Sequence, residues 1–291
     1  MPLSKLNLGA QWMIVAGFLF AIMGVFVKLG SAYFSSAELV FYRSIIGLVV
    51  IYAIVRVQRL PLATAHISKH LWRGLSGFFA LLLFFHAISV LPLATAITLN
   101  YTSPMFLALL LTLILKEKTH WGLISTILIG FAGVVLLLRP TLQAGQFNAG
   151  LIGLASGFLA GVAYFNVTQL GKEGEPAWRI VFYFTLVSTL GAGAWMLIHT
   201  FQPLAWKHLP ILLGLGASAT LAQLAMTRAY RLGNTLVVGS LAYTTVIFAS
   251  LFGIALWGEW LERLSWLGVG LIVISGSTSV LWTQRASSIV K

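Results

Sequence analysis

The chain has 291 residues, of which 59% are hydrophobic and only 8% are charged, and its formal net charge is +12. Soluble domains carry about 25% charged residues, so this composition excludes a water-soluble protein and indicates one embedded in a membrane. The basic residues are scattered between apolar runs and form no stripe with interleaved aromatics, which argues against a nucleic-acid partner.

Apolar runs long enough to cross about 30 Å of hydrocarbon recur ten times along the chain. They cover approximately residues 11–30, 36–55, 72–91, 93–115, 120–138, 149–170, 178–199, 208–229, 234–257 and 265–283. When the N-terminus is placed in the cytoplasm, 13 of the 18 basic residues fall on the cytoplasmic side. This bias predicts a multi-pass protein of the cell inner membrane with both termini cytoplasmic.

The two halves of the chain repeat with a shift of 140 to 142 residues. The matching segments are Gly17-Phe18-Leu19 with Gly157-Phe158-Leu159, Tyr101-Thr102 with Tyr243-Thr244, and Glu117 with Glu259. Because five spans per half is an odd number, the second copy must enter the membrane from the opposite side. The sequence therefore predicts an all-α integral membrane protein of ten transmembrane helices. They form two inverted five-helix repeats, in residues 1–140 and 149–285.

Motifs at fixed places in the first half return in the second. Leu91-Pro92-Leu93-Ala94-Thr95-Ala96, Tyr101-Thr102-Ser103-Pro104 and Lys116-Glu117-Lys118 are echoed by Ala229 to Val237, Tyr243-Thr244 and Gly258-Glu259. In this order and spacing the chain resembles the EamA-type members of the drug/metabolite transporter superfamily. The resemblance implies ten helices in two five-helix halves. It also implies transport of amino acids, nucleobase-like compounds, vitamins or related solutes. One departure is Val246 in place of Pro104, so the two central helices are not expected to bend alike.

The polar pentapeptide Asn100-Tyr101-Thr102-Ser103-Pro104 interrupts the middle of the fourth apolar run. Pro104 kinks the helix and frees the carbonyl of Asn100, which is tolerable only where the helix faces protein or a water-filled cavity. Inverted-repeat transporters bind substrate at that depth, between their halves. We therefore predict a central binding cavity lined by Asn100, Tyr101, Ser103, Tyr243 and Thr244. The alternative is a packing kink whose hydroxyls bond within their own helices.

Further polar side chains lie inside other spans. Gln223 in the eighth span and Asn166 in the sixth are either substrate ligands or interhelical hydrogen-bond partners. Arg43 lies about 10 Å into the second span, and Glu38 and Lys28 nearby indicate a charged cluster at the outer mouth. Arg43 either attracts an anionic substrate group or acts in a gate, or it forms a structural pair with Glu38 or a carbonyl.

Glycines on the sixth span predict close helix packing. Gly153, Gly157 and Gly161 recur at every fourth residue and leave one side of that helix without side chains.

The residue inventory excludes most enzyme classes. The chain has no Asp and no Cys, its six Glu lie near span ends, and it has no phosphate-binding loop. We expect no cofactor and no metal site, and the expected partners are a small-molecule substrate and the lipid bilayer. The predicted function is a carrier that moves a small organic metabolite by alternating access. An amino-acid-like solute is favoured, and a vitamin or nucleobase-type metabolite is the alternative. A passive channel fits less well, because the polar residues cluster at the midplane.

Overall fold

The regular elements of the protein are helices throughout the residues that the computed structural model describes, which are 3–114, 125, 128–130, 132–137, 146–199, 201–233, 238 and 241–289. The first half contains α1 (Leu3–Gly30), α2 (Ser36–Val57), α3 (Ile67–Val90), α4 (Leu93–Asn100) and α5 (Ser103–Ile114). The second contains α7 (Phe147–Lys172), α8 (Ala177–Ile198), a short 3-10 turn η1 (Trp206–His208), α9 (Leu209–Leu232), α11 (Thr244–Trp257) and α12 (Arg263–Ile289).

Seven stretches of the described chain are long and apolar enough to cross a membrane, and shorter apolar helices add to them. Within the predicted fifth span, residues 125, 128–130 and 132–137 are described, and they are helical. Glu117 lies outside the described residues. The predicted all-α, multi-pass fold is confirmed.

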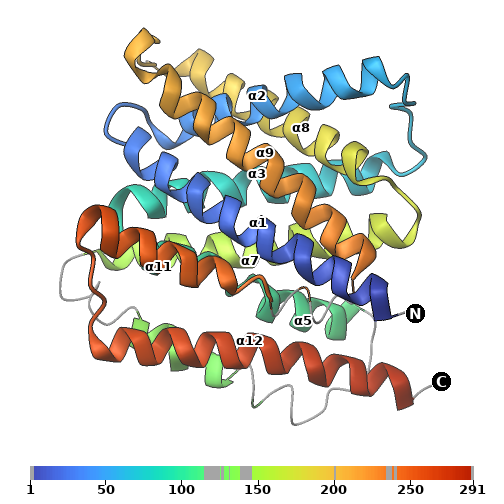
Figure 1. The fold of residues 1–291 in the computed structure, drawn as a ribbon, viewed down its shortest axis with the longest axis vertical. Helices are drawn as coiled ribbons and strands as arrows, with labels where there is room; N and C mark the ends of the chain where they lie inside the picture. Colours follow the sequence, from blue (N-terminus) through green and yellow to red (C-terminus); the bar gives the residue numbers. More distant parts are fainter. Residues whose placement is uncertain are drawn as a thin grey trace.

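The two halves cross the bundle in opposite directions (Figure 1). One end of the bundle, called here the terminal end, carries both chain termini and the α2–α3 and α7–α8 connections. The opposite end carries the α1–α2, α3–α4 and α11–α12 connections. The first helix of the first half, α1, starts at the terminal end, whereas its counterpart α7 finishes there. The second half is therefore inverted, as predicted.

The helix contacts follow the same symmetry. The first helix of each half packs against the third helix of the other half: α1 against α9, and α7 against α3. Two other cross-half pairs join equivalent helices, α2 with α8 and α4 with α11, and α1 also contacts α11 as α7 contacts α4 and α5. This exchange is what a two-fold axis in the membrane plane produces. The core is consequently shared between the halves.

Matching glycines let the halves approach at the centre. A Cβ on Gly17 would lie 2.6 Å from Thr244 Oγ1, and a Cβ on Gly157 would lie 2.5 Å from the carbonyl oxygen of Leu99. The helices that carry these glycines, α1 and α7, thus pack directly onto the central helix of the other half. The sequence predicted such close packing for the side of α7 that carries Gly153, Gly157 and Gly161. Two equivalent edge-to-face ring pairs accompany these contacts: Phe18 with Phe248 at 5.3 Å and Phe106 with Phe158 at 5.4 Å between ring centres.

The central helix of each half is interrupted at the same place in the repeat. Between α4 and α5 the chain forms a turn at Tyr101 and Thr102, and before α11 it forms a turn at Ala242 and Tyr243. The hydroxyl of Thr102 donates to the carbonyl of Leu99, and that of Thr244 to the carbonyl of Leu241, both at 2.7 Å. Hydroxyls that bond back to the helix compete with its backbone ladder. The two central helices, which were not expected to bend alike, are thus both interrupted, and the threonine shared by both halves marks both breaks.

Candidate functional site

A cavity at the centre of the bundle is lined by side chains from both halves. The space between its lining atoms, including the part open to solvent, totals about 560 Å³. Its polar lining consists of Arg43, Arg73, Asn100, Tyr101, Tyr164, Gln223 and Thr245, and Phe20, Phe84 and Phe184 are among its apolar residues.

 With these apolar residues included, the lining elements are α1 to α4 and the turn at Tyr101 in the first half, and α7, α8, α9 and α11 in the second. The cavity therefore lies at the interface of the repeats.

The two broken helices meet beside this cavity. Thr245, directly after the second break, donates a hydrogen bond of 2.9 Å to the hydroxyl oxygen of Tyr101, at the first break. Both side chains are buried. Because the Tyr101 oxygen accepts this bond, its own O–H remains available as a donor towards the cavity. The bond joins the two halves at the wall of the cavity.

Two arginines dominate the charge of the cavity. Arg43 on α2 and Arg73 on α3 are only 3% and 2% exposed. Their guanidinium carbons lie 5.0 and 4.0 Å from the centre of the Phe184 ring on α8. Within the described part of the chain, Nε and Nη1 of Arg43 and Nε of Arg73 have no hydrogen-bond partner. Buried charges are ordinarily paired, yet the described residues that line the cavity include no carboxylate beside these two cations.

The amides of the cavity add further donors. Asn100 donates from Nδ2 to the hydroxyl of Ser156 at 3.0 Å, which fixes the orientation of its side chain. Gln223 is buried, and its Nε2 finds no partner among the described residues. Asn100, Tyr101 and Gln223 all line the central cavity, and their part in substrate binding stays a prediction.

Other predicted site residues lie beside the cavity. Ser103 and Pro104 line a smaller neighbouring cavity that shares Tyr101 and Tyr164 with the central one. Tyr243 is buried within the second break, and Thr244 bonds within its own turn, so the residue that reaches the central cavity is Thr245. The shift by one residue follows from the inserted turn, which changes the side of the helix that each residue faces.

Asn166 bonds within its own helix. Its Nδ2 donates to the carbonyl of Val162 at 3.0 Å, one turn earlier on α7. Of the two interpretations that the sequence left open, the structure favours a structural role for this amide.

Glu38 and Arg43 do not form the predicted charged cluster. Glu38 accepts hydrogen bonds from the backbone N–H of Ser35 at 2.7 Å and of Gln202 at 2.6 Å, while Ser35 caps the first turn of α2 in return. This reciprocal capping box satisfies helix-end donors and occupies the carboxylate. Arg43 instead reaches into the central cavity, so it is separated from Glu38 in role and in partners.

Arg73 is the cavity residue that the sequence did not indicate. It is the second residue of the apolar run 72–91, so the sequence predicts it at the end of the third span. The helix begins earlier, at Ile67, which moves Arg73 about 9 Å into α3. The glycines that follow Arg73 in the sequence could have indicated that its side chain is buried against the helix, since a Cβ on Gly77 would collide with the Arg73 guanidinium.

An ion pair joins the halves at the opposite end of the bundle. Lys28, near the end of α1, pairs with Glu259, which follows α11. The other carboxylate oxygen of Glu259 accepts the backbone N–H of Leu93 at 2.8 Å, at the start of α4. Lys28 thus belongs to this cross-half contact and not to a cluster with Arg43.

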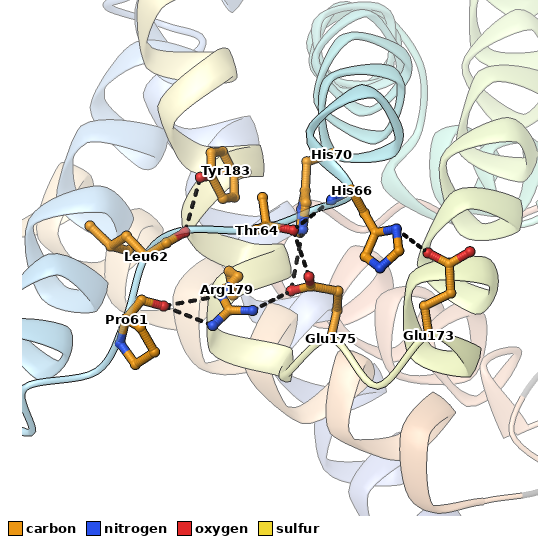
Figure 2. Close-up of polar contacts among 9 residues, drawn as sticks. All are labelled: Pro61, Leu62, Thr64, His66, His70, Glu173, Glu175, Arg179 and Tyr183. Atoms are coloured by element: carbon orange, nitrogen blue, oxygen red, sulfur yellow. Dashed lines mark hydrogen bonds and ion pairs between the residues drawn. The ribbon is translucent and has the colours of Figure 1, made fainter.

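A larger polar network joins the halves at the terminal end, and Figure 2 shows its members side by side. We call it the end cluster, and it consists of Pro61, Leu62, Thr64, His66, His70, Glu173, Glu175, Arg179 and Tyr183, with Lys69 beside them. The α2–α3 connection supplies carbonyl and hydroxyl groups: Arg179 donates to the Pro61 carbonyl at 2.8 Å, and Thr64 donates to Glu175 at 2.6 Å. His66 Nδ1 lies 2.6 Å from Glu173 Oε2.

The two carboxylates of the end cluster are held in their charged form. Hydrogen bonding from Lys69 lowers the pKa of Glu173 below its ordinary value, and the charge of His66 adds to this. Burial alone would raise the pKa of Glu175, but hydrogen bonds from Thr64 and Arg179 and the charge of Arg179 hold it below the ordinary value. The end cluster is therefore an ionic contact between the halves at neutral pH.

Comparison with known proteins identifies the family. The model of the EamA-like transporter family matches residues 7–139 and again residues 148–280. The chain belongs to the EamA-like transporter family. The resemblance read from the sequence motifs is thereby confirmed, and the two matches agree with the duplicated halves of the fold.

Relatives with known activities are transporters of small metabolites. The chain is 30% identical to the pseudopaline exporter CntI of Pseudomonas aeruginosa over 94% of this chain and 96% of that protein. It is 26% identical to the riboflavin transporter of Vibrio cholerae, over 96% of this chain and 95% of that one. An S-adenosylmethionine uptake transporter of Rickettsia bellii is 21% identical, over 97% and 96% of the two chains. This EamA-family chain is therefore a membrane transporter of small metabolites and not an enzyme.

A solved crystal structure shares the fold. It superposes with a TM-score of 0.67 over 98% of this chain and 99% of its own, at 18% sequence identity.

Proposed function

We propose that the protein carries an amino-acid-like solute across the cell inner membrane by alternating access, and that it binds a carboxylate of the solute between Arg43 and Arg73. The observation that carries this proposal is the pair of buried guanidiniums with unpartnered N–H groups in a cavity at the centre of the bundle. Arginine pairs with carboxylates through two parallel hydrogen bonds, which fixes the orientation of the bound group as well as its charge.

The remaining lining groups suit the rest of such a molecule. Gln223 and the O–H of Tyr101 offer hydrogen bonds to polar atoms of the solute. Tyr164 and Phe84 line the same cavity, and their ring faces suit an amino group or an apolar side chain. Polar groups from both halves thus surround one bound molecule.

The contacts at the two ends of the bundle support alternating access. The Lys28–Glu259 pair holds the halves together at the opposite end, and the end cluster holds them together at the terminal end. The central cavity lies between these contacts. We propose that the protein opens to one side of the membrane by breaking one contact while the other stays closed, so that the cavity never connects both sides.

The orientation follows from the distribution of basic residues. The terminal end carries many of them, including Arg56, Arg59, Lys69, Lys172 and Arg231. By the positive-inside rule, this supports our proposal that this end, with both termini, lies in the cytoplasm.

A vitamin or nucleobase-type metabolite is the alternative substrate. The aromatic lining suits a planar ring, and one relative is named as a riboflavin transporter. An uncharged ring, however, would leave both guanidiniums without a counter-charge in the bound state, which is costly in a buried site. The charge of the cavity therefore favours the carboxylate-bearing solute.

Counterflow in proteoliposomes tests the proposal. Vesicles that contain the purified protein are preloaded with one unlabelled amino acid or related carboxylate at a time, and uptake of the labelled compound is followed. We expect saturable counterflow for a carboxylate-bearing solute, and its loss in Arg43→Gln. The matched control is Arg228→Gln, because Arg228 is an exposed cation stacked on Trp12 at the other side of α9 from the cavity lining.

Counterflow of an uncharged vitamin or nucleobase that persists in Arg43→Gln would overturn the assignment of the carboxylate. Uptake that neither saturates nor shows counterflow would replace the carrier with a channel.

A further inference from the structure

We infer that the transported solute carries two acid groups and enters the cavity as a net dianion, with one carboxylate on Arg43 and the other on Arg73. This inference rests on the proposed function and narrows its substrate class. It excludes simple zwitterions, whose single carboxylate matches one arginine only.

The charge of the cavity is the first argument. Both arginines remain protonated at any physiological pH. Among the described residues that line the cavity there is no carboxylate. A ligand with a single negative charge would leave one positive charge unpaired at the centre of the membrane, whereas a dianion makes the occupied cavity neutral.

The glutamates elsewhere in the described chain are committed to other partners. Glu38 caps α2, Glu259 pairs with Lys28, and Glu173 and Glu175 belong to the end cluster. Glu262 is exposed in the connection that precedes α12. The described protein thus offers the two arginines no counter-charge, and the second negative charge must come from the ligand.

The geometry places both arginines within reach of one small molecule. They come from different helices, α2 and α3, and both guanidinium carbons lie within 5.0 Å of the centre of the Phe184 ring. The unpartnered groups are donors in each case: Nε and Nη1 of Arg43, Nε of Arg73 and Nε2 of Gln223. Unpartnered hydrogen-bond donors bind a ligand that supplies acceptors, and two carboxylates give a small molecule many acceptor oxygens.

The inference predicts strong discrimination between a dicarboxylate and its half-amide, which has nearly the same shape and one charge fewer. Leaving one member of a buried charge pair unpaired costs about 2 kcal/mol or more, so the half-amide should bind about 30-fold more weakly or worse.

The experiment measures binding to the purified, full-length protein in detergent by calorimetry and by ligand-induced thermal stabilisation. The probes are matched pairs at equal ionic strength: succinate with succinamate, and glutarate with glutaramate. We expect the dicarboxylate of at least one pair to bind about 30-fold more tightly than its half-amide. Arg73→Gln should abolish this difference, Arg73→Lys should retain part of it, and Arg228→Gln should leave it unchanged.

The ligand-free variants separate binding from a structural role. Because Arg73→Gln removes an unpaired buried charge, the ligand-free variant should unfold at the same temperature as the wild type or at a higher one. A lower unfolding temperature for this variant, with an unchanged preference for dicarboxylates, would assign Arg73 to the fold and overturn the inference.

Two other outcomes would also overturn it. Equal binding of each dicarboxylate and its half-amide, lost in Arg43→Gln, would refute the dianion while the proposed carboxylate carrier stands. No binding of any dicarboxylate beyond its half-amide, together with counterflow of a monocarboxylate, would do the same. Loss of counterflow for every carboxylate is the separate result that would refute the proposed function.

Discussion

Replacing Gly157 by alanine tests whether the close approach of α7 to the first broken helix holds the cavity in shape. A Cβ at this position would lie 2.5 Å from the carbonyl oxygen of Leu99 and would also collide with the hydroxyl of Thr102. A carbon and a carbonyl oxygen come no closer than about 3.3 Å even in favourable contacts. The backbone at the break must therefore move by roughly 1 Å to make room.

The cost of this movement can be set against the gain in helix propensity. Overpacking of this kind costs about 1 to 3 kcal/mol, while replacing a helical glycine by alanine gains up to about 1 kcal/mol. We expect Gly157→Ala to lose about 1 to 2 kcal/mol of stability. Asn100 and Tyr101 follow Leu99 directly, so the displacement should also weaken substrate binding.

A second glycine of the same helix provides the control. A Cβ on Gly171 would meet only the Cγ of Arg231, at an ordinary 3.9 Å, so Gly171→Ala should keep or raise the stability. Thermal unfolding of the purified variants in detergent, followed by intrinsic fluorescence, compares the two. Equal unfolding temperatures for Gly157→Ala and Gly171→Ala would refute the reasoning, since both replacements make the same chemical change in α7.

Two further predictions concern the contacts at the ends of the bundle. Lys28→Met and Glu259→Gln should each lower the unfolding temperature, because each removes the same partly buried ion pair. The double variant should therefore lose less stability than the two single variants added together, with a coupling energy of about 1 kcal/mol. Strictly additive losses would contradict the ion pair. The pKa values of Glu173 and Glu175 are below the ordinary 4.5 in the folded protein, so their stabilisation is fully present above that pH and is lost as the pH falls through the lowered folded values. Unfolding temperatures measured from neutral pH downwards should therefore fall less steeply in acid for Glu175→Gln than for the wild type, and parallel curves would exclude this contribution.

Hydropathy and the repeat were sufficient to predict the architecture. Apolar runs reveal membrane helices because unpaired backbone groups are too costly in lipid. The alignment of Gly17 with Gly157 and of Tyr101 with Tyr243 revealed the inverted duplication. The structure places the two glycines in equivalent contacts and the two tyrosines in the turns that interrupt the central helices.

The details of the site depended on information that periodicity does not carry. An apolar window starts α3 at Trp72, but basic and polar residues of the first turns are also helical, so Arg73 lies deeper than the window indicates. Glu38 was readable from the sequence, because Ser35 three residues before it completes a capping-box pattern. Thr245 was missed because a turn inside a helix shifts the facing side chain, and hydropathy does not register such turns.

The reciprocal packing of glycine helices on broken helices has a consequence for biogenesis. Each half leaves the interruption of its own central helix to be covered by the other half, through Gly17 for the second copy and Gly157 for the first. A single copy translated alone would expose the loosened carbonyls of that interruption to acyl chains, where such groups are not tolerated. The first five helices are therefore expected to insert without reaching their final packing. Folding is completed when the second copy has been inserted and each copy covers the interruption of the other.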